Sequence, residues 1–202
     1  MSALTLDFTQ FIQDELHQLE EYDAQRPAGH PYAFHEHVQR VANAMRDLAT
    51  AMNHPQVEEL YLASLAHDAG KRLLPVGIWD TDGKPSDKIR KQRRRHTTLG
   101  VKIVDDTFGK DNHDPFLDLL RDLMQNHHEA INGTGWLGKE YDDLSLEARM
   151  LCVCDAFDGY SVWRPHFKDR DISPKAVIHR MEIEKEGQFD AEILNIFKKI
   201  KL

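Results

Sequence analysis

The chain has 202 residues, 41% of them apolar and 30% charged, which is typical of a folded soluble protein and argues against disorder. No apolar run approaches the roughly 18 residues that span a bilayer, and the acidic, amphipathic N-terminus lacks the layout of a secretory signal. We therefore expect a cytoplasmic protein without a membrane partner. The net charge of −8 argues against general binding of a nucleic-acid polymer.

Apolar residues recur with a helical period along most of the chain. The first three predicted helices cover residues 6–22, 35–52 and 57–69, and two prolines and a glycine interrupt the chain at 26–31. We divide the chain into an N-terminal helical extension, 1–34, and a domain, 35–202.

A loop at 73–88, rich in proline and glycine, precedes the second half of the chain. Further helices are predicted at 90–108, 115–128, 145–163, 174–186 and 190–200. No run has the alternation of a strand, so the predicted fold class is all-α. Cys152 and Cys154 point about 200° apart on a helix, which favours small core residues in a reducing compartment over a shared ion.

The third predicted helix ends in the most informative motif, in which Gly70 and Lys71 follow His67–Asp68. The aspartate can bridge two cations, the histidine can hold one of them, and the lysine can reach a substrate oxygen. The dipeptide alone proves little, because His113–Asp114 is a second copy in a loop-like stretch before Pro115.

Other histidines and acids at helix ends or inner faces separate the two copies. Twelve histidines are many for this length, and histidine is the commonest metal ligand. The candidate ligands besides the motif are His37, His96, His127, His128 and Asp155, with His35 as an alternative to His37. This set suffices for two divalent ions with open positions for water, and a hydroxide shared by two metals is a nucleophile for phosphorus.

In this order the residues resemble the HD-domain metal phosphohydrolases. The segment 127–136, His-His-Glu-Ala-Ile-Asn-Gly-Thr-Gly-Trp, resembles the HHExxDGxGYP loop of the HD-GYP subfamily, as do Ala156-Phe157-Asp158, Arg164–Pro165 and Gly187-Gln188-Phe189-Asp190. The resemblance covers about residues 35 to 200. It implies an HD-domain helical bundle with a central dinuclear metal site, and an enzyme that hydrolyses a cyclic dinucleotide, chiefly cyclic di-GMP.

The resemblance also implies roles for the matching residues. One metal would be held by His37, His67, Asp68 and Asp155, and the other by Asp68, His96, His127 and His128. Iron or manganese are the expected ions, with other divalent ions as alternatives. Lys71 would contact the scissile phosphate or aid proton transfer with Asp158 as its partner, and Arg164 would bind a substrate phosphate. Trp136 either stacks on a base or packs to close the glycine loop.

The chain departs from the family pattern in the loop that shapes substrate and partner contacts. Asn132, Trp136 and Leu137 stand where the motif has Asp, Tyr and Pro. Other substrates therefore stay open, and the alternatives are a nucleotide phosphomonoesterase and a non-catalytic nucleotide sensor or adaptor. The loop Gly133–Leu137 is the predicted contact for a protein partner, and a homodimer is a further candidate assembly.

Two further positions bear on metal count and charge. Ala33 stands where three-metal members have a glutamate, which favours two metals, although Glu36 lies close by. Phe167 replaces a basic residue that usually follows the substrate-binding arginine, with Lys168 adjacent. The basic run at 88–95 is either a solvated face or a means of steering anions towards His96.

Overall fold

The computed structural model describes residues 6–27, 32–80, 83–164 and 167–202. Within these ranges every regular element is a helix, and the one extended pairing is an isolated bridge between Asn132 and Glu140. The predicted all-α class is confirmed. Of the helices so described, none combines the length and apolar character needed to cross a bilayer.

The α-helices are α1 (Leu6–Asp23), α2 (Phe34–Ala51), α3 (Val57–Leu65), α4 (Asp87–Arg94), α5 (His96–Phe108), α6 (Pro115–Asn126), α7 (Leu146–Ser161), α8 (Pro174–His179) and α9 (Ala191–Lys201). Short 3₁₀ turns occur at η1 (Ala69–Leu73), η2 (Val76–Ile78) and η3 (Tyr141–Asp143), and η5 (Arg180–Glu184) is a wider π-helical turn.

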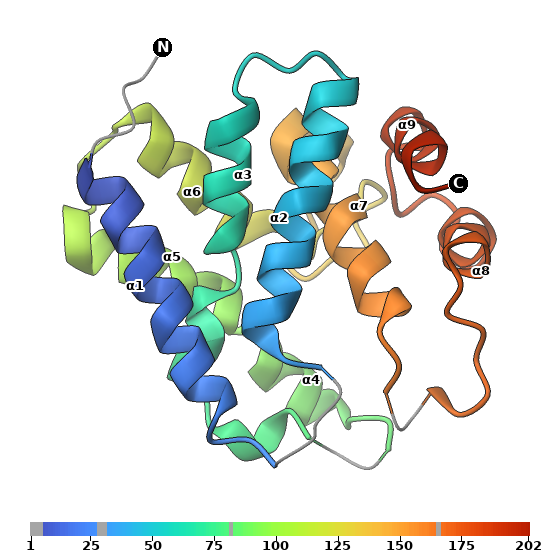
Figure 1. Cartoon of the computed structure of the whole chain (residues 1–202), viewed down its shortest axis with the longest axis horizontal. Coiled ribbons are helices and arrows are strands. Elements are labelled where there is room, and N and C mark those ends of the chain that lie inside the picture. Colours follow the sequence, from blue (N-terminus) through green and yellow to red (C-terminus); the bar gives the residue numbers. More distant parts are fainter. Residues whose placement is uncertain (1–5, 28–31, 81–82, 165–166) are drawn as a thin grey trace.

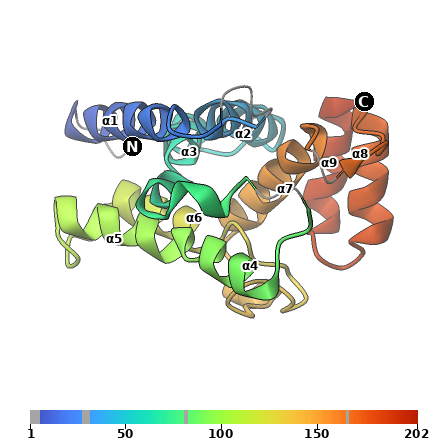
Figure 2. The same cartoon turned by 90° about the horizontal axis from the view of Figure 1, so that it is seen from below.

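The helices form two layers joined by α7 (Figures 1 and 2). In Figure 2, α1, α2 and α3 make one layer and α4, α5 and α6 the other, while α8 and α9 lie together at one end. The central helix α2 packs against α1, α3, α7 and α9. Because α7 contacts both α2 and α6, it connects one helix of each layer.

One large apolar cluster, with a smaller one around Tyr22 and Phe34, forms the core. The apolar stripe of α2 is fully buried, as its helical spacing predicts, and burial of apolar surface is the main stabilising term. The helix predicted as part of an extension, α1, contributes Phe8, Phe11 and Ile12 to the same core. The division of the chain after residue 34 stays a prediction.

Side-chain caps set the starts of many helices. An oxygen of each capping side chain accepts a backbone N–H of the first turn, which is the preferred role of Ser and Asp there. The caps are Ser86, Asp114, Ser145, Ser173 and Asp190. Pro115 stands at the first helical position after Asp114, where its missing N–H costs nothing. The second His–Asp copy is therefore a helix start.

Three predicted helices differ in the structure. The third helix was expected to continue to residue 69 but ends at Leu65, because the next N–H groups bond three residues back. The helix predicted at 90–108 is two helices, since the N–H of Arg95 bonds to Gln92 and the chain turns there. In place of the single helix predicted at 174–186, the chain forms the short helix α8, which continues into the π-helical turn η5.

Candidate metal centre

His67–Asp68 lies in the turn between α3 and η1, and not within a helix as predicted. The N–H of His67 bonds to the carbonyl of Ser64, and the N–H of Lys71 bonds to that of Asp68. A 3₁₀ turn has about three residues, so side chains three apart eclipse one another. Lys71 accordingly forms an ion pair with Asp68, and its Nζ lies 4.4 Å from the ring centre of Phe34.

The Asp68 carboxylate lies between two groups of histidines. Its Oδ2 is 3.3 Å from His37 Nε2 and 3.5 Å from His67 Nε2. Its Oδ1 is 3.1 Å from His96 Nε2 and 3.5 Å from His127 Nε2. One carboxylate thus presents a separate oxygen to each group, which is the arrangement of a bridging ligand.

The candidate ligands form two clusters in which all donor atoms lie within 4.8 Å of one another. The first contains His37, His67 and Asp155, and the second contains Asp68, His96, His127 and His128. All seven predicted ligands are therefore brought together. The alternative His35 is not among them, because its ring nitrogen lies 3.0 Å from Asp23.

Backbone carbonyls fix the tautomer of three of these histidines. The Nδ1 atoms of His67 and His96 lie 2.7 Å and 2.6 Å from the carbonyls of Ser64 and Arg93. His127 Nδ1 likewise lies 3.0 Å from a carbonyl of α6. A carbonyl can only accept, so Nδ1 carries the hydrogen and Nε2 keeps its lone pair. Those lone pairs face the cluster, as metal ligation requires.

Burial favours the ligating protonation states of most members. It lowers the pKa of His67 and of His128, and that of His96 to about 4. Burial alone would raise the pKa of Asp68, but Lys71 and neighbouring histidines hold it well below its usual range. At neutral pH these groups are neutral imidazoles and an ionised carboxylate.

His37 behaves differently. Burial lowers its pKa, but the neighbouring carboxylates of Asp155, Asp158 and Asp68 outweigh this and raise the pKa to about 10. A protonated imidazole has no lone pair at the ligating nitrogen, so a bound cation must displace a proton there.

The donor set fits a pair of divalent ions. His37 Nε2, His67 Nε2 and both oxygens of Asp68 are buried and make no hydrogen bond within the part of the chain that is described. Buried polar atoms are nearly always paired. The two imidazole nitrogens face Asp68 Oδ2, while Oδ1 faces the other histidine group, so these atoms fit a cation on each side of the carboxylate. Imidazole with carboxylate suits zinc, iron or manganese more than calcium.

Asp158 is not the partner of Lys71, as was predicted. Its carboxylate accepts a hydrogen bond from His37 Nδ1 at 2.6 Å and two from Arg40, at 2.6 Å and 3.1 Å. Asp155 and Asp158 are one turn apart on α7, and both lie beside His37 of α2. Lys71 instead pairs with Asp68. Asp158 therefore orients a candidate ligand from behind.

A pocket of about 900 Å³ opens beside the two clusters. The predicted substrate residues Lys71, Trp136 and Arg164 all line it. Arg164 stacks 4.1 Å above the ring of Tyr32 and donates to the carbonyl of Gly159 at 3.0 Å. Its Nε is buried and makes no hydrogen bond to any residue that the structure describes. Pro165, which belonged to the same sequence motif, lies outside the described residues.

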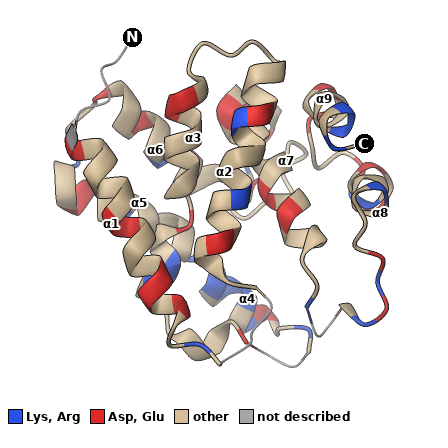
Figure 3. Cartoon of the chain, viewed as in Figure 1, with Lys and Arg blue, Asp and Glu red and all other residues tan. Residues whose placement is uncertain are grey.

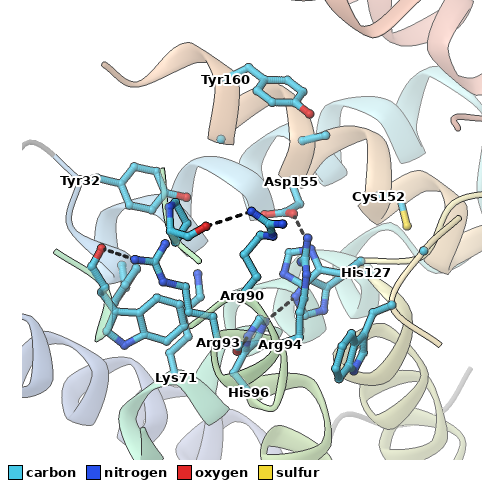
Figure 4. A pocket seen from close by; sticks show the side chains of 18 of the residues that line it. Tyr32, Lys71, Arg90, Arg93, Arg94, His96, His127, Cys152, Asp155 and Tyr160 are labelled. Carbon is cyan, nitrogen blue, oxygen red and sulfur yellow. Dashed lines mark hydrogen bonds and ion pairs between the residues drawn. The ribbon is translucent and has the colours of Figure 1, made fainter. Parts of the chain in front are cut away.

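Several lining residues escaped prediction. Figure 4 shows Arg90, Arg93 and Arg94 in the middle of the view, with Tyr160 above them and Lys71 and His96 below. The basic run at 88–95 is visible in the sequence. The side of α4 that faces the pocket depends on the turn at Arg95, which the sequence periodicity does not predict. Figure 3 shows this basic helix among scattered acidic residues.

Glu129 closes the glycine loop after the paired histidines, a role the sequence did not indicate. Its buried carboxylate accepts the N–H of Leu137 at 2.7 Å and that of Lys139 at 3.0 Å. A Cβ on Gly135 would lie 2.5 Å from Glu129 Cα, so glycine is required for this approach. The backbone N–H of Trp136 donates to the backbone carbonyl of His128 at 3.3 Å, which ties the loop to the residue of a candidate ligand.

Residues 34–160 match the HD domain family over more than half of the chain. The chain belongs to this family. It is 35% identical over 146 residues to a cyclic di-GMP phosphodiesterase of Pseudomonas aeruginosa, covering 72% of the chain and 33% of that protein. It is 27% identical over 135 residues to the cyclic di-GMP phosphodiesterase response regulator RpfG of Xanthomonas campestris, covering 66% and 34%. The chain thus spans about a third of these relatives.

Solved structures agree with this HD domain in fold. An HDG"Y"P protein from Bdellovibrio bacteriovorus has a TM-score of 0.67 at 18% identity, covering 96% of this chain and 60% of that one. The HD domain of the L. monocytogenes phosphodiesterase PgpH, in complex with cyclic-di-AMP, has a TM-score of 0.54 at 16% identity, covering 91% and 92%. The predicted resemblance and the helical HD-domain fold are confirmed, and the His/Asp clusters indicate divalent metal binding.

Replacing Asp158 by asparagine is expected to weaken metal binding by this HD domain about 10- to 100-fold, because carboxylates behind ligating histidines tune them by that amount. Titration of metal-free protein with Mn²⁺, followed by calorimetry, measures the change. The matched control is Glu58→Gln, since Glu58 pairs with Arg46 of α2 at 2.8 Å but contacts no histidine of the clusters. Equal affinities of both variants would contradict the assigned role.

Replacing Glu129 by glutamine is expected to free the loop, because an amide group cannot accept both N–H bonds. Losing a buried charged acceptor costs about 1–3 kcal/mol of unfolding free energy. Hydrogen exchange at the amides of Leu137 and Lys139 should accelerate most, while Asp142→Asn, at an exposed carboxylate nearby, should leave it unchanged. Unchanged exchange in the Glu129 variant would show that other contacts close the loop.

Proposed function

We propose that this HD domain is a metal-dependent phosphodiesterase that hydrolyses a cyclic dinucleotide, with cyclic di-GMP as the first candidate. The observation that carries the proposal is the Asp68 carboxylate between two histidine clusters at the wall of a pocket lined by arginines. The relatives named as cyclic di-GMP phosphodiesterases support this choice of substrate.

We infer two divalent ions, iron or manganese, held by His37, His67, Asp68 and Asp155 on one side and Asp68, His96, His127 and His128 on the other. Such ions would supply a hydroxide near neutral pH and neutralise the phosphoryl oxygens. The protein residues would balance the charge of the ions and orient the ligands. Asp68 and Asp155 balance the cationic charge, and the fixed tautomers aim the imidazoles.

Lys71 and Arg164 would bind the substrate phosphates. Lys71 is buried beside Asp68 and lines the pocket, so its ammonium can donate to a phosphoryl oxygen or move a proton. Arg164 offers a guanidinium held by Tyr32, and a planar fork of donors suits a phosphate. Trp136, half-buried in the loop, has a face on which a base can stack.

Pocket size favours a dinucleotide over a mononucleotide. A volume of about 900 Å³ lies near the upper end of the roughly 300–1,000 Å³ of small-molecule sites. The phosphomonoesterase alternative is thereby less favoured, although the altered residues Asn132 and Leu137 keep it as the second candidate. Because another relative is named as specific for 3'3'-cGAMP, that cyclic dinucleotide is the next candidate substrate after cyclic di-GMP.

The test is a substrate panel with protein reconstituted with iron or with manganese under reducing conditions. Cyclic di-GMP, 3'3'-cGAMP and cyclic di-AMP are each incubated, and the products are separated by chromatography. We expect linear dinucleotide or mononucleotide from cyclic di-GMP. Inorganic phosphate released from mononucleotides alone would favour the monoesterase, and tight binding without product would favour a sensor or adaptor.

For partners, we infer that the loop Gly133–Leu137 can take a protein, because Leu137 is 42% exposed at its end. A homodimer is the alternative, and sedimentation velocity of the wild type and of Leu137→Ser distinguishes a self-association that uses this loop.

A further inference from the structure

The pocket receives more positive charge from α4 than the predicted substrate residues account for. Arg90, Lys91, Arg93 and Arg94 all line it. Two of these side chains are paired within the protein. Arg93 donates to the carbonyls of Ile78 and Trp79 at 2.8 Å and 3.0 Å, and Arg90 forms an ion pair with Asp87. Lys91 is exposed at the rim.

Arg94 has a different environment. It is half-buried, and among the described residues its guanidinium makes no hydrogen bond and has no carboxylate within ion-pair distance. Water satisfies an exposed arginine, but a partly desolvated one is costly unless something pairs with it. Of the two residues adjacent to Arg94 in the sequence, Arg93 is bonded to backbone carbonyls and Arg95, which follows α4, is exposed.

The charges that act on Arg94 belong to the metal centre and its loop. Arg94 lines the same pocket as Asp155, His128 and Glu129. The carboxylates whose charge acts on its guanidinium are those of Asp155, Asp68 and Glu129. The oxygens of Asp68 and Asp155 already face imidazoles, and Glu129 holds the loop. The guanidinium therefore faces the centre without being used by it.

We propose that Arg94 binds a non-bridging oxygen of the phosphoryl group placed at the metal centre, and so is a further catalytic residue. The inference rests on the proposed phosphodiesterase function but does not depend on which diester is cleaved. A guanidinium pairs with phosphoryl oxygens through two parallel N–H bonds. Its attraction grows as negative charge accumulates on those oxygens in the transition state, which lowers the barrier.

The experiment compares Arg94→Gln and Arg94→Lys with the control Arg95→Gln, all loaded with manganese. Arg95 is the adjacent residue, is exposed and does not line the pocket. The substrates are bis(4-nitrophenyl) phosphate, a diester without bases, and cyclic di-GMP. Binding of inorganic phosphate is measured by calorimetry, which does not require turnover. Metal content and Tm are recorded for every variant.

Arg94→Gln is expected to lower kcat on bis(4-nitrophenyl) phosphate about 100-fold, the typical loss for one donor to a developing oxyanion. Phosphate should bind about 10-fold more weakly, with metal content and Tm unchanged. Arg94→Lys should fall between, because it keeps the charge but not the fork. In a further variant, Arg94→Ala, which leaves room for a free guanidinium ion, guanidinium chloride added at millimolar concentration should restore part of the rate. Arg95→Gln should stay within about twofold of the wild type.

The inference is overturned if Arg94→Gln keeps both kcat and phosphate affinity, or if its loss follows a loss of metal or of Tm. Its failure is distinct from failure of the proposed function. A wild type that cleaves bis(4-nitrophenyl) phosphate but leaves every cyclic dinucleotide intact refutes the substrate while Arg94 is still tested. A metal-loaded wild type that cleaves neither diester refutes both.

Discussion

Asp68→Asn is expected to remove most metal from the centre and to lower diester cleavage at least about a thousandfold, the largest loss of any single substitution in this chain. The amide keeps the size of the side chain but loses the charge that balances two cations. It also has one oxygen where the two histidine groups each face one, at 3.3 Å and 3.1 Å. Elemental analysis and turnover measure the effect.

The chain supplies its own control for this experiment. Asp114 follows a histidine as Asp68 does, but it caps α6 by accepting the N–H of Phe116 at 2.9 Å. Asparagine caps a helix as well as aspartate. Asp114→Asn should therefore retain full metal content and activity, and His113→Ala should do the same because that side chain is largely exposed. Similar losses at both copies would contradict a site specific to Asp68.

Gly70→Ala is expected to have the largest effect on stability. A Cβ at this position would lie 2.1 Å from the carbonyl oxygen of His96 and 2.5 Å from the nitrogen of Gly100. Both contacts are backbone atoms of α5, so no side chain can rotate away. Overpacking costs about 1–3 kcal/mol in a core, and we expect about 3 kcal/mol or more here. For a domain of this size that lowers Tm by roughly 6–12 °C.

Gly77→Ala is the matched control, because a Cβ there would meet no described residue within 4 Å. Its Tm should stay within about 2 °C of the wild type. Since Gly70 lets η1 approach the start of α5, its substitution should also separate Asp68 from His96 and weaken metal binding. A Gly70→Ala variant with unchanged Tm and metal affinity would show that α5 moves freely, contrary to the close packing described.

The helices and the ligand set could be predicted because both depend on local patterns. The stripe of α2, the proline after Asp114 and the order of the histidines are each visible in the sequence. His37 could not be separated from His35 by pattern alone. The structure separates them through tertiary contacts, since Asp23 of α1 engages His35 while Asp158 of α7 engages His37.

The contacts that the sequence did not predict depend on the turns between helices. After the early end of α3, Lys71 pairs with Asp68, while Asp158 pairs with His37. The turn at Arg95 aims Arg94 at the pocket, and Glu129 acts through loop N–H groups eight and ten residues away. These relations depend on how the turns orient side chains and backbone N–H groups, which helical periodicity does not predict.

The central claim is that Asp68 joins two metal ions into one phosphodiesterase centre. Its most direct test is the rate of cyclic di-GMP cleavage by metal-free protein as Mn²⁺ is added in measured equivalents. We predict little cleavage up to one equivalent and a rise to a plateau at about two, as expected when both ions are needed for hydroxide formation and charge neutralisation. A plateau at one equivalent, or no cleavage at any loading, would contradict the account.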